Sequence, residues 1–571
     1  MLNFNKMKKK IYLVAFMIVG ILACSDDFTE TVEIGSLNPA SLQTPAGIDF
    51  LLTAAYSSLD GISGVSGGWQ ATGDNWWSDA ISDDAHKGST DGDQQTLMNL
   101  ETFNWNTGND YIAGKWRALY AGVNRSNAVI SVIEGGDDPS AFTNQLAQAY
   151  FLRGHYYFEL ARQYGYASIV SKENFDNFEF NQPNNDPAAV WAQAEADMTF
   201  AVNNLPASQG AEAARANSWA AKAYLGKIQL YQGNWSGALT TLDDVINNGP
   251  YALLPEFVDN FRLAGELGSE AVFSINFDTA GGAFAPNGNQ GGTLNFGGPN
   301  GWCCGFYQPS QDLANTFQTD GAGLPLLDTY NQTDVTNDYG ITSGDAFTPH
   351  TGPLDPRIDY TIGRRGINYN NWDLHPGSSW VRAGFSDISG PYIAKKNVYY
   401  NGESANQGSG NWGQQHSGIN YNIIRYADVL LMAAEAAVET NDLAKAVGYV
   451  DQVRQRAIDM TRVSNDGGAT DAANYDIATY GTFADQATAR KAVRMERRLE
   501  LSMEGHRLFD IRRYGNGETI MAEYITNEKR TMDQSNYDGK FSAYQSRHNL
   551  FPVPVGAIDQ SGGALTQNPD W

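Results

Sequence analysis

The chain has 571 residues, 42% of them hydrophobic and 18% charged, and its formal net charge is -26. This composition is globular, and the length exceeds one core of ordinary domain size, so we expect several domains or one extended helical solenoid. Such an acidic surface repels phosphate backbones, which disfavours binding to nucleic acid.

The first 23 residues have the features of a secretory signal peptide. A segment with four lysines precedes the uncharged run 11–23, which is too short to span a bilayer comfortably. The sequence Ile-Leu-Ala-Cys then ends at Cys24 and resembles the lipobox of bacterial lipoproteins, in which this cysteine becomes the lipidated first residue. The alternatives are an ordinary signal peptide with a chance cysteine or an uncleaved anchor. With only three cysteines in the chain, the lipobox is favoured, and the acidic, polar residues 24–40 are interpreted as a tether.

Apolar residues recur at helical spacing along much of the chain. One helix is preceded by Asp186-Pro187, a favourable pair for a helix start. A helix–turn–helix with the turn Gly233-Asn234-Trp235 resembles a tetratricopeptide unit, in which small residues let paired helices approach closely. The predicted helical segments are residues 45–59, 116–133, 145–164, 187–205, 216–248, 423–457 and 486–514.

Between about residues 281 and 418 the long helical periods disappear. Glycine, asparagine, proline and aromatic residues dominate this stretch. A segment of this length without helices is normally functional loop or small sheet laid over a scaffold. The sequence therefore predicts a mainly α fold: a tetratricopeptide-like helical-repeat scaffold with a large loop-rich insertion that carries a little β structure.

A charged motif near the C-terminus invites comparison with a catalytic or metal site. Glu500, Glu504 and His506 lie within one short segment that also contains several arginines. The spacing Glu-x-x-x-Glu-x-His has no established ligand geometry. We therefore predict a buried charge network here rather than an acid–base or metal centre.

Two long motifs and the chain's closing segment resemble the SusD/RagB family. They are residues 421–436 (YNIIRYADVLLMAAEA), residues 494–513, which begin RMERRLEL, and residues 549–554 (NLFPVP). Because the motifs occur in the family's order and the lipobox and helical pattern agree, the resemblance covers almost the entire chain. It implies a SusD-like domain over residues 41–571.

The resemblance also implies a function. Members of this family are lipid-anchored proteins of the outer membrane, exposed at the cell surface. They capture polysaccharide or oligosaccharide and sit as a lid on a SusC-like TonB-dependent transporter that imports it. The family has no catalytic activity and needs no cofactor. The expected partners of this chain are therefore a glycan, that transporter and the membrane, with no nucleic acid.

Sugar rings present an apolar face, on which aromatic rings stack, and hydroxyl groups that bind amides, carboxylates and guanidinium groups. Tryptophans in polar loops are therefore candidate contacts, and a role in packing is the competing interpretation for each of them. The family motifs do not fix these positions. The predicted glycan-binding residues are Trp76, Trp77, Trp302 and Trp372, with Asn75, Asp79 and Asn371 as polar partners.

Two smaller features have open interpretations. Cys303 and Cys304 are adjacent, so they form either a strained vicinal disulfide beside Trp302 or two free thiols. A cluster of aspartates could hold a structural calcium ion, but its spacing does not match a helix–loop–helix calcium site, so a solvated acidic loop is favoured. These aspartates are Asp83, Asp84, Asp91 and Asp93.

Three other functions remain in competition. A secreted glycoside hydrolase would need two carboxylates facing across a cleft, but no strand–helix alternation indicates a barrel. A SusD-like protein could instead bind peptides or glycoproteins. A general helical-repeat adaptor would leave the lipobox and the tryptophan-rich insertion unexplained. Among glycans a neutral one is favoured, since the acidic surface opposes polyanions unless arginines such as Arg364, Arg365 and Arg382 gather at the site.

Overall fold

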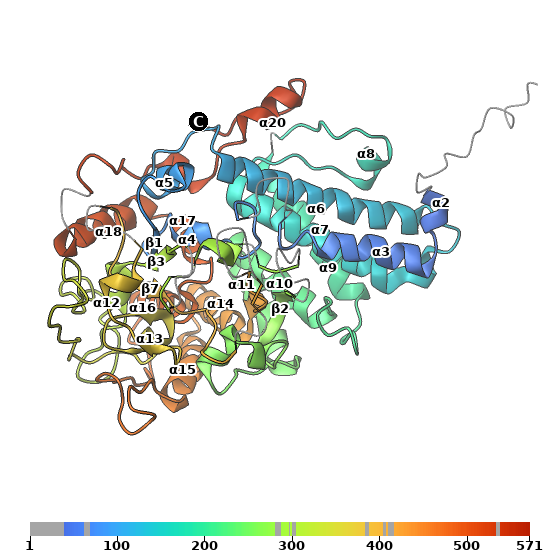
Figure 1. The fold of residues 1–571 in the computed structure, drawn as a ribbon. Coiled ribbons are helices and arrows are strands. Elements are labelled where there is room, and N and C mark those ends of the chain that lie inside the picture. Colours follow the sequence, from blue (N-terminus) through green and yellow to red (C-terminus); the bar gives the residue numbers. More distant parts are fainter. Residues whose placement is uncertain are drawn as a thin grey trace, which may run out of the picture.

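The structure is a computed structural model. It describes residues 39–571 except 62–68, 185, 280–286, 290, 296, 300–303, 383–386, 404–406, 409–415 and 533–536. The predicted signal peptide and Cys24 lie outside the described residues. Figure 1 shows the long helices α3, α6, α7 and α9 side by side at one end of the molecule, and the shorter elements of the insertion at the other end, with α16 and α18.

Paired helices form the scaffold, as predicted. Each packs against its neighbours in the series, and the glycines let them approach closely: a Cβ at Gly122 would lie 2.4 Å from the ring of Tyr156, and one at Gly226 would lie 2.6 Å from Leu242. None of the described helices is both long and apolar enough to span a bilayer. The scaffold helices are α3 (Pro45–Tyr56), α6 (Asp110–Glu134), α7 (Thr143–Tyr164), α9 (Pro187–Asn204), α10 (Ser218–Tyr231), α11 (Trp235–Asn248), α14 (Tyr426–Glu439), α15 (Leu443–Asp459) and α16 (Gln486–Leu501).

Shorter helices connect the scaffold to the rest of the chain. Those before the insertion are α2 (Pro39–Leu42), α4 (Trp76–Asp79), α5 (Gln95–Glu101) and α8 (Lys172–Asp176). The insertion contributes α12 (Gln311–Thr316) and α13 (Ile358–Thr361). The C-terminal part adds α17 (Arg507–Tyr514), α18 (Gly517–Thr531) and α20 (Val555–Gln560).

The strands described form four separate antiparallel pairs. They are β1 (Ala85–Gly88) with β3 (Phe306–Pro309), β2 (Ala271–Ile275) with β8 (Tyr421–Arg425), β4 (Ile362–Gly363) with β7 (Ile393–Ala394), and β5 (Asn368–Tyr369) with β6 (Asp373–Leu374).

The predicted helix over residues 423–457 was wrong at its start. Ile423 and Ile424 belong to β8, which pairs with β2, and the helix begins only at Tyr426. No glycine or proline separates the strand from the helix, so the apolar run carried no local boundary signal. The predicted block also contains two helices, since α14 ends at Glu439 and α15 begins at Leu443.

The charged motif is a buried network, as predicted. Glu500 accepts hydrogen bonds from Arg357 at 2.9 Å and from Arg425 at 2.6 Å, and it also pairs with Arg456. Burial alone would raise the pKa of Glu500, but these three guanidinium groups outweigh it and hold that pKa well below its usual range. Burial and the charge of Lys227 lower the pKa of His506 to about 3, so its ring is neutral.

Candidate functional site

The loop that carries Trp76 and Trp77 is part of the core, contrary to the predicted glycan platform. Trp76 is 2% exposed and Trp77 is 1% exposed. The ring of Trp77 lies 5.5 Å from that of Phe551, and its Nε1 donates to the carbonyl of Gln70 at 3.2 Å. Neither ring presents a face to solvent: Trp77 packs in the core, and Trp76 packs there too while also lining a small pocket of about 40 Å³.

The polar neighbours of these rings, Asn75 and Asp79, are also buried inside the protein. Asp79 is fully buried and accepts hydrogen bonds from the hydroxyl of Tyr307 and the backbone N–H of Gly505, both at 2.7 Å. Burial, together with the negative charge of Asp84, raises the pKa of Asp79 to about 7. Asn75 is buried at a φ of 51°, a left-handed conformation that asparagine tolerates, just before α4. The prediction that Asn75 and Asp79 contact sugar was therefore wrong for this structure.

The β5–β6 hairpin brings two of the predicted residues together at the surface. Asn371 is exposed in the turn, at a φ of 60°. Trp372 follows it and is half-buried, with its Nε1 donating to the carbonyl of Tyr399 at 2.9 Å. Its ring packs against a small cluster that includes Val398, which fixes its orientation. Trp302, the remaining predicted tryptophan, lies outside the described residues.

The two smaller features have different outcomes. Cys304 is disulfide-bonded, which excludes a free thiol there, while Cys303 lies outside the described residues. The solvated acidic loop was wrong for Asp83 and Asp84, because both are buried and pair with Arg498. Within the described part of the chain, no group of three or more acidic, histidine or cysteine side chains is placed to hold a metal ion.

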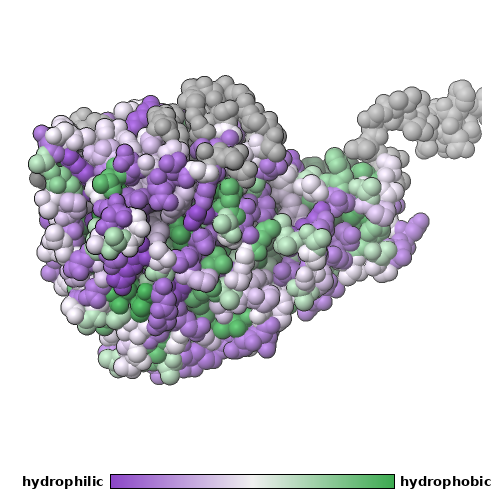
Figure 2. All heavy atoms as spheres, turned by 60° about the horizontal axis from the view of Figure 1, so that its bottom comes forward, coloured by the Kyte–Doolittle hydropathy of each residue, from purple (hydrophilic) through white to green (hydrophobic). Residues whose placement is uncertain are grey.

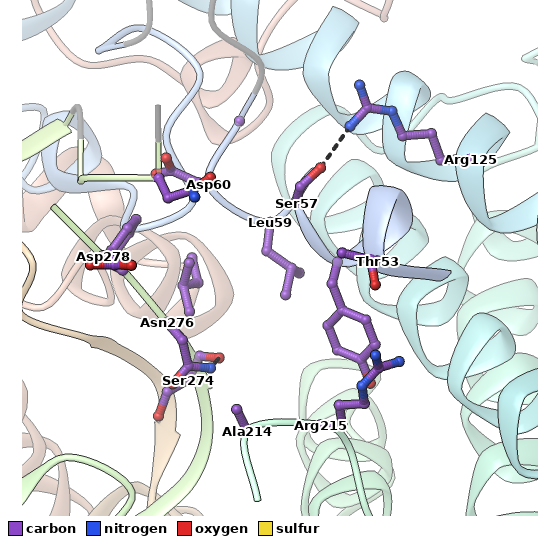
Figure 3. Close-up of a pocket in the computed structure, with 15 residues that line it drawn as sticks. Thr53, Ser57, Leu59, Asp60, Arg125, Ala214, Arg215, Ser274, Asn276 and Asp278 are labelled. Atoms are coloured by element: carbon purple, nitrogen blue, oxygen red, sulfur yellow. Dashed lines mark hydrogen bonds between the residues drawn. The ribbon is translucent and has the colours of Figure 1, made fainter. Parts of the chain in front are cut away.

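A pocket of about 660 Å³ opens between the end of α3, the middle of α6 and the end of β2 (Figure 3). Asp60, Asn276 and Asp278 lie on one side, Arg125, Ser57 and Thr53 lie on the other, and Leu59 lies between them. We call this space pocket 1. Its lining also includes Tyr56, Gly61, Ala214, Arg215, Ser274, Ile275, Phe277 and Asn287.

Most of the polar walls of pocket 1 are held by hydrogen bonds. Arg125 donates to Ser57 Oγ at 3.1 Å and to the carbonyl of Ala54 at 3.0 Å. The hydroxyl of Tyr56 donates to Gln148 at 2.9 Å, while the guanidinium group of Arg215 lies 5.6 Å from the centre of its ring. The pocket is thus a preformed cavity with mixed aromatic, amide and charged walls, the kind of lining that orients a polar ligand.

Residues of one chain segment after β2 line pocket 1 and a second, smaller pocket. The N–H of Asp278 donates to the carbonyl of Asn287, and the N–H of Asn289 donates to the carbonyl of Ser417 at 2.7 Å. Asn289 and Ser417 line a second pocket of about 40 Å³, together with Val398, which packs under Trp372. We call pocket 1, this second pocket and the hairpin the binding strip.

Comparison with known proteins identifies the family. A model of the SusD family matches residues 269–571, and a SusD-like model described as starch-binding associating with outer membrane matches residues 59–230. The chain belongs to the SusD family. SusD-like protein P2 of Formosa agariphila is 25% identical, with 99% of this chain and all of that protein covered. A SusD-like protein of Bacteroides ovatus is 24% identical, covering 79% of this chain and 76% of that protein.

Solved structures of SusD-like proteins share the fold. A SusD-like carbohydrate binding protein from Bacteroides fragilis superposes with a TM-score of 0.69 and 22% identity, over 92% of this chain and 99% of that one. Surface glycan-binding protein A from Bacteroides thetaiotaomicron, in complex with laminarihexaose, gives a TM-score of 0.66 and 20% identity, over 92% and 99%. The predicted family and its tetratricopeptide-like scaffold are confirmed.

In this SusD-family chain, the sequence pointed to none of the residues of pocket 1. Asp60-Gly61 forms a turn directly after α3, and an Asp-Gly pair is a common turn signal that says nothing about binding. Asn276 and Asp278, which lie on the same side of the pocket as Asp60, follow β2 more than 200 residues later in the chain. Figure 2 shows hydrophilic, intermediate and hydrophobic residues intermixed over the face of the protein that it presents.

Proposed function

We propose that this SusD-family protein binds oligosaccharide or polysaccharide along the binding strip and delivers it to a SusC-like TonB-dependent transporter. It acts by binding alone, without catalysis. The observation that carries the proposal is that the half-buried Trp372 and the exposed Asn371 are neighbours in the β5–β6 hairpin, in a protein that also has a mixed polar pocket of about 660 Å³. The laminarihexaose bound to the relative from Bacteroides thetaiotaomicron supports a glycan ligand.

Replacing Trp372 with alanine is expected to weaken glycan binding by about tenfold or more, because the aromatic stacking surface is lost. Isothermal titration of the purified chain without its first 23 residues measures this, with laminarihexaose, neutral xylan and mannan oligosaccharides, and oligogalacturonate as probes. Trp219→Ala is the matched control, since Trp219 is a half-buried tryptophan on α10 of the scaffold. Its affinity should stay within about twofold of the wild type.

Other outcomes of the same titration would contradict the proposal. Binding of peptides with no affinity for any of the glycans would make the chain a peptide binder. Release of reducing ends from a bound glycan would make it a hydrolase. An equal loss of affinity in Trp372→Ala and Trp219→Ala would show that the β5–β6 hairpin is not part of the binding site.

The protein is proposed to be anchored by lipid on Cys24, at the cell-surface side of the outer membrane. The family description, starch-binding associating with outer membrane, supports this location. Changing Cys24 to alanine is expected to move the protein from the membrane fraction to the soluble fraction, because the acyl chains are attached only at this cysteine. Fractionation with immunoblotting measures the shift, and continued membrane retention of the variant would contradict the anchor. A Cys304→Ala variant is the control and should stay in the membrane.

A further inference from the structure

The segment around α8 carries the most exposed large apolar side chain in the described part of the chain. Phe178 is 81% exposed, and Phe180 is 41% exposed. The ring of Phe180 lies 6.3 Å from that of Phe178 and 6.0 Å from that of the half-buried Phe175. Single exposed apolar residues are common, but a cluster of aromatic rings at the surface marks an interaction site. We call residues 171–180 the α8 loop.

The α8 loop holds these rings in a fixed and unfavourable backbone conformation. Phe178 has a φ of 58°, a left-handed conformation that is rare for a bulky side chain. Its N–H donates to the carbonyl of Phe175 at 3.1 Å, and the N–H of Glu179 donates to the carbonyl of Asn174 at 2.8 Å. Ser171 and Asn174 cap α8 reciprocally. Strained residues held in this way cluster at functional sites.

The α8 loop and α2 both pack at the C-terminal end of α6. Ser131, in the last turn of α6, donates to Asp176 of α8 at 2.5 Å. A Cβ at Gly136, just after α6, would lie 3.6 Å from the side chain of Gln43, which follows α2. Figure 1 shows α2 and α8 on the right-hand side of the molecule. The proposed lipid on Cys24 is joined to α2 by residues 24–38, which span at most about 50 Å, so this end is tethered close to the membrane.

Carboxylates flank the rings of the α8 loop. Glu173, Asp176 and Glu179 are exposed, whereas Lys172 is the one basic residue in the loop and pairs with Asp176 at 2.6 Å. An anionic lipid surface repels such a loop, while basic groups on a protein pair with it. The rings also meet at 79° and 76°, so they form no flat platform for a sugar. Charge and shape therefore favour a protein partner.

We propose that the α8 loop is a docking surface for a membrane-embedded protein: Phe178 and Phe180 enter an apolar pocket of the partner, and the flanking carboxylates pair with basic groups at the rim of that pocket. Aromatic side chains inside a polar rim are the usual centre of a protein–protein interface. The inference rests on the proposed lipid anchor and transporter partnership, and it adds the surface through which the chain contacts the transporter.

Purification of the tagged, lipid-anchored chain from detergent-solubilised outer membranes tests the inference, with quantitative mass spectrometry of the TonB-dependent transporters retained. Phe178→Asn combined with Phe180→Ser is expected to retain about tenfold less transporter than the wild type, because the centre of the interface is lost. Raising the salt concentration should also reduce the transporter retained by the wild type, since the carboxylate contacts are screened. A photocrosslinking phenylalanine analogue at position 178 should join the chain directly to the same transporter.

Leu267→Asn is the matched control, because Leu267 is 45% exposed and also has a left-handed backbone, at a φ of 53°, but lies between α11 and β2. This variant should retain the transporter as the wild type does. Asparagine tolerates the left-handed conformation, so the thermal midpoint of Phe178→Asn should equal or exceed that of the wild type. Its affinity for glycan, measured by isothermal titration, should stay within about twofold of the wild type.

The possible outcomes separate this inference from the proposed function. Wild-type retention of the transporter by the double variant would overturn the docking surface while leaving the partnership in place. Flotation of the chain without its first 23 residues on phosphatidylcholine vesicles, lost in the double variant, would also overturn it, because the loop would then bind lipid. Absence of any TonB-dependent transporter from the wild-type preparation would instead contradict the proposed partnership.

Discussion

Replacing Glu500 with glutamine is expected to lower the free energy of unfolding by about 3–5 kcal/mol, although the side chain keeps its size. The network around Glu500 contains equal numbers of positive and negative groups, all of them buried, so the variant leaves one uncompensated positive charge in the interior. Its cations are Arg357, Lys396, Arg425, Arg454 and Arg456, and its carboxylates are Asp355, Glu496, Glu500, Glu504 and Glu270.

Denaturant unfolding followed by fluorescence and circular dichroism measures this loss. Glu523→Gln is the matched control, because Glu523 is an exposed glutamate on α18. That control should change the free energy of unfolding by less than about 0.5 kcal/mol. A loss below about 1 kcal/mol in Glu500→Gln would show that the arginines find other partners or water, and the network would then not hold the fold together.

Replacing Trp77 with alanine is expected to destabilise the protein by about 3–5 kcal/mol, the usual cost of truncating a buried aromatic side chain. The indole is 1% exposed, lies in contact with the rings of Tyr111 and Phe551, and donates a hydrogen bond to Gln70. Its removal creates a cavity in the core and also leaves that carbonyl without its indole partner.

The same unfolding measurement, made beside a glycan titration of the folded variant, separates packing from binding at Trp77. Affinity should remain within about threefold of the wild type once the unfolded fraction is subtracted. Trp372→Ala should show the opposite pattern, with a large loss of affinity and a loss of stability of about 1 kcal/mol. A loss of glycan affinity without a loss of stability in Trp77→Ala would show that Trp77 acts in glycan binding and not in packing.

The sequence was informative about the helices because their apolar stripes follow a local period. α9 begins at Pro187 and α10 and α11 flank the turn at Gly233, where local capping and turn signals indicated them. The sequence did not predict strand β8, because the apolar run that contains Ile423 and Ile424 is compatible with a buried strand as well as with a buried helix. Its conformation depends on β2, about 150 residues earlier in the chain.

The candidate site was less predictable, because exposure is not a local property. Asp79 lies in a segment with the composition of a sugar-binding loop. Its hydrogen-bond partners, however, are Tyr307 and Gly505, which lie 228 and 426 residues away in the sequence. At the hairpin, Asn370 and Asn371 both have left-handed backbones, so the asparagines that suggested binding also form the turn that leaves Asn371 exposed. No sequence motif indicated pocket 1, because the segments that line it come together only in the folded chain.

The ion pairs of Asp83 have a consequence for how this chain reaches its native state. Asp83 binds Arg507, 424 residues further along, and Arg498 joins Asp83 and Asp84 to Asp312. Two aspartates near the start of the chain are therefore buried charges that gain their counterions only when residues near its end are present. Truncated chains lack that neutralisation, so we expect the compact state to form only once residues near both ends of the chain are present.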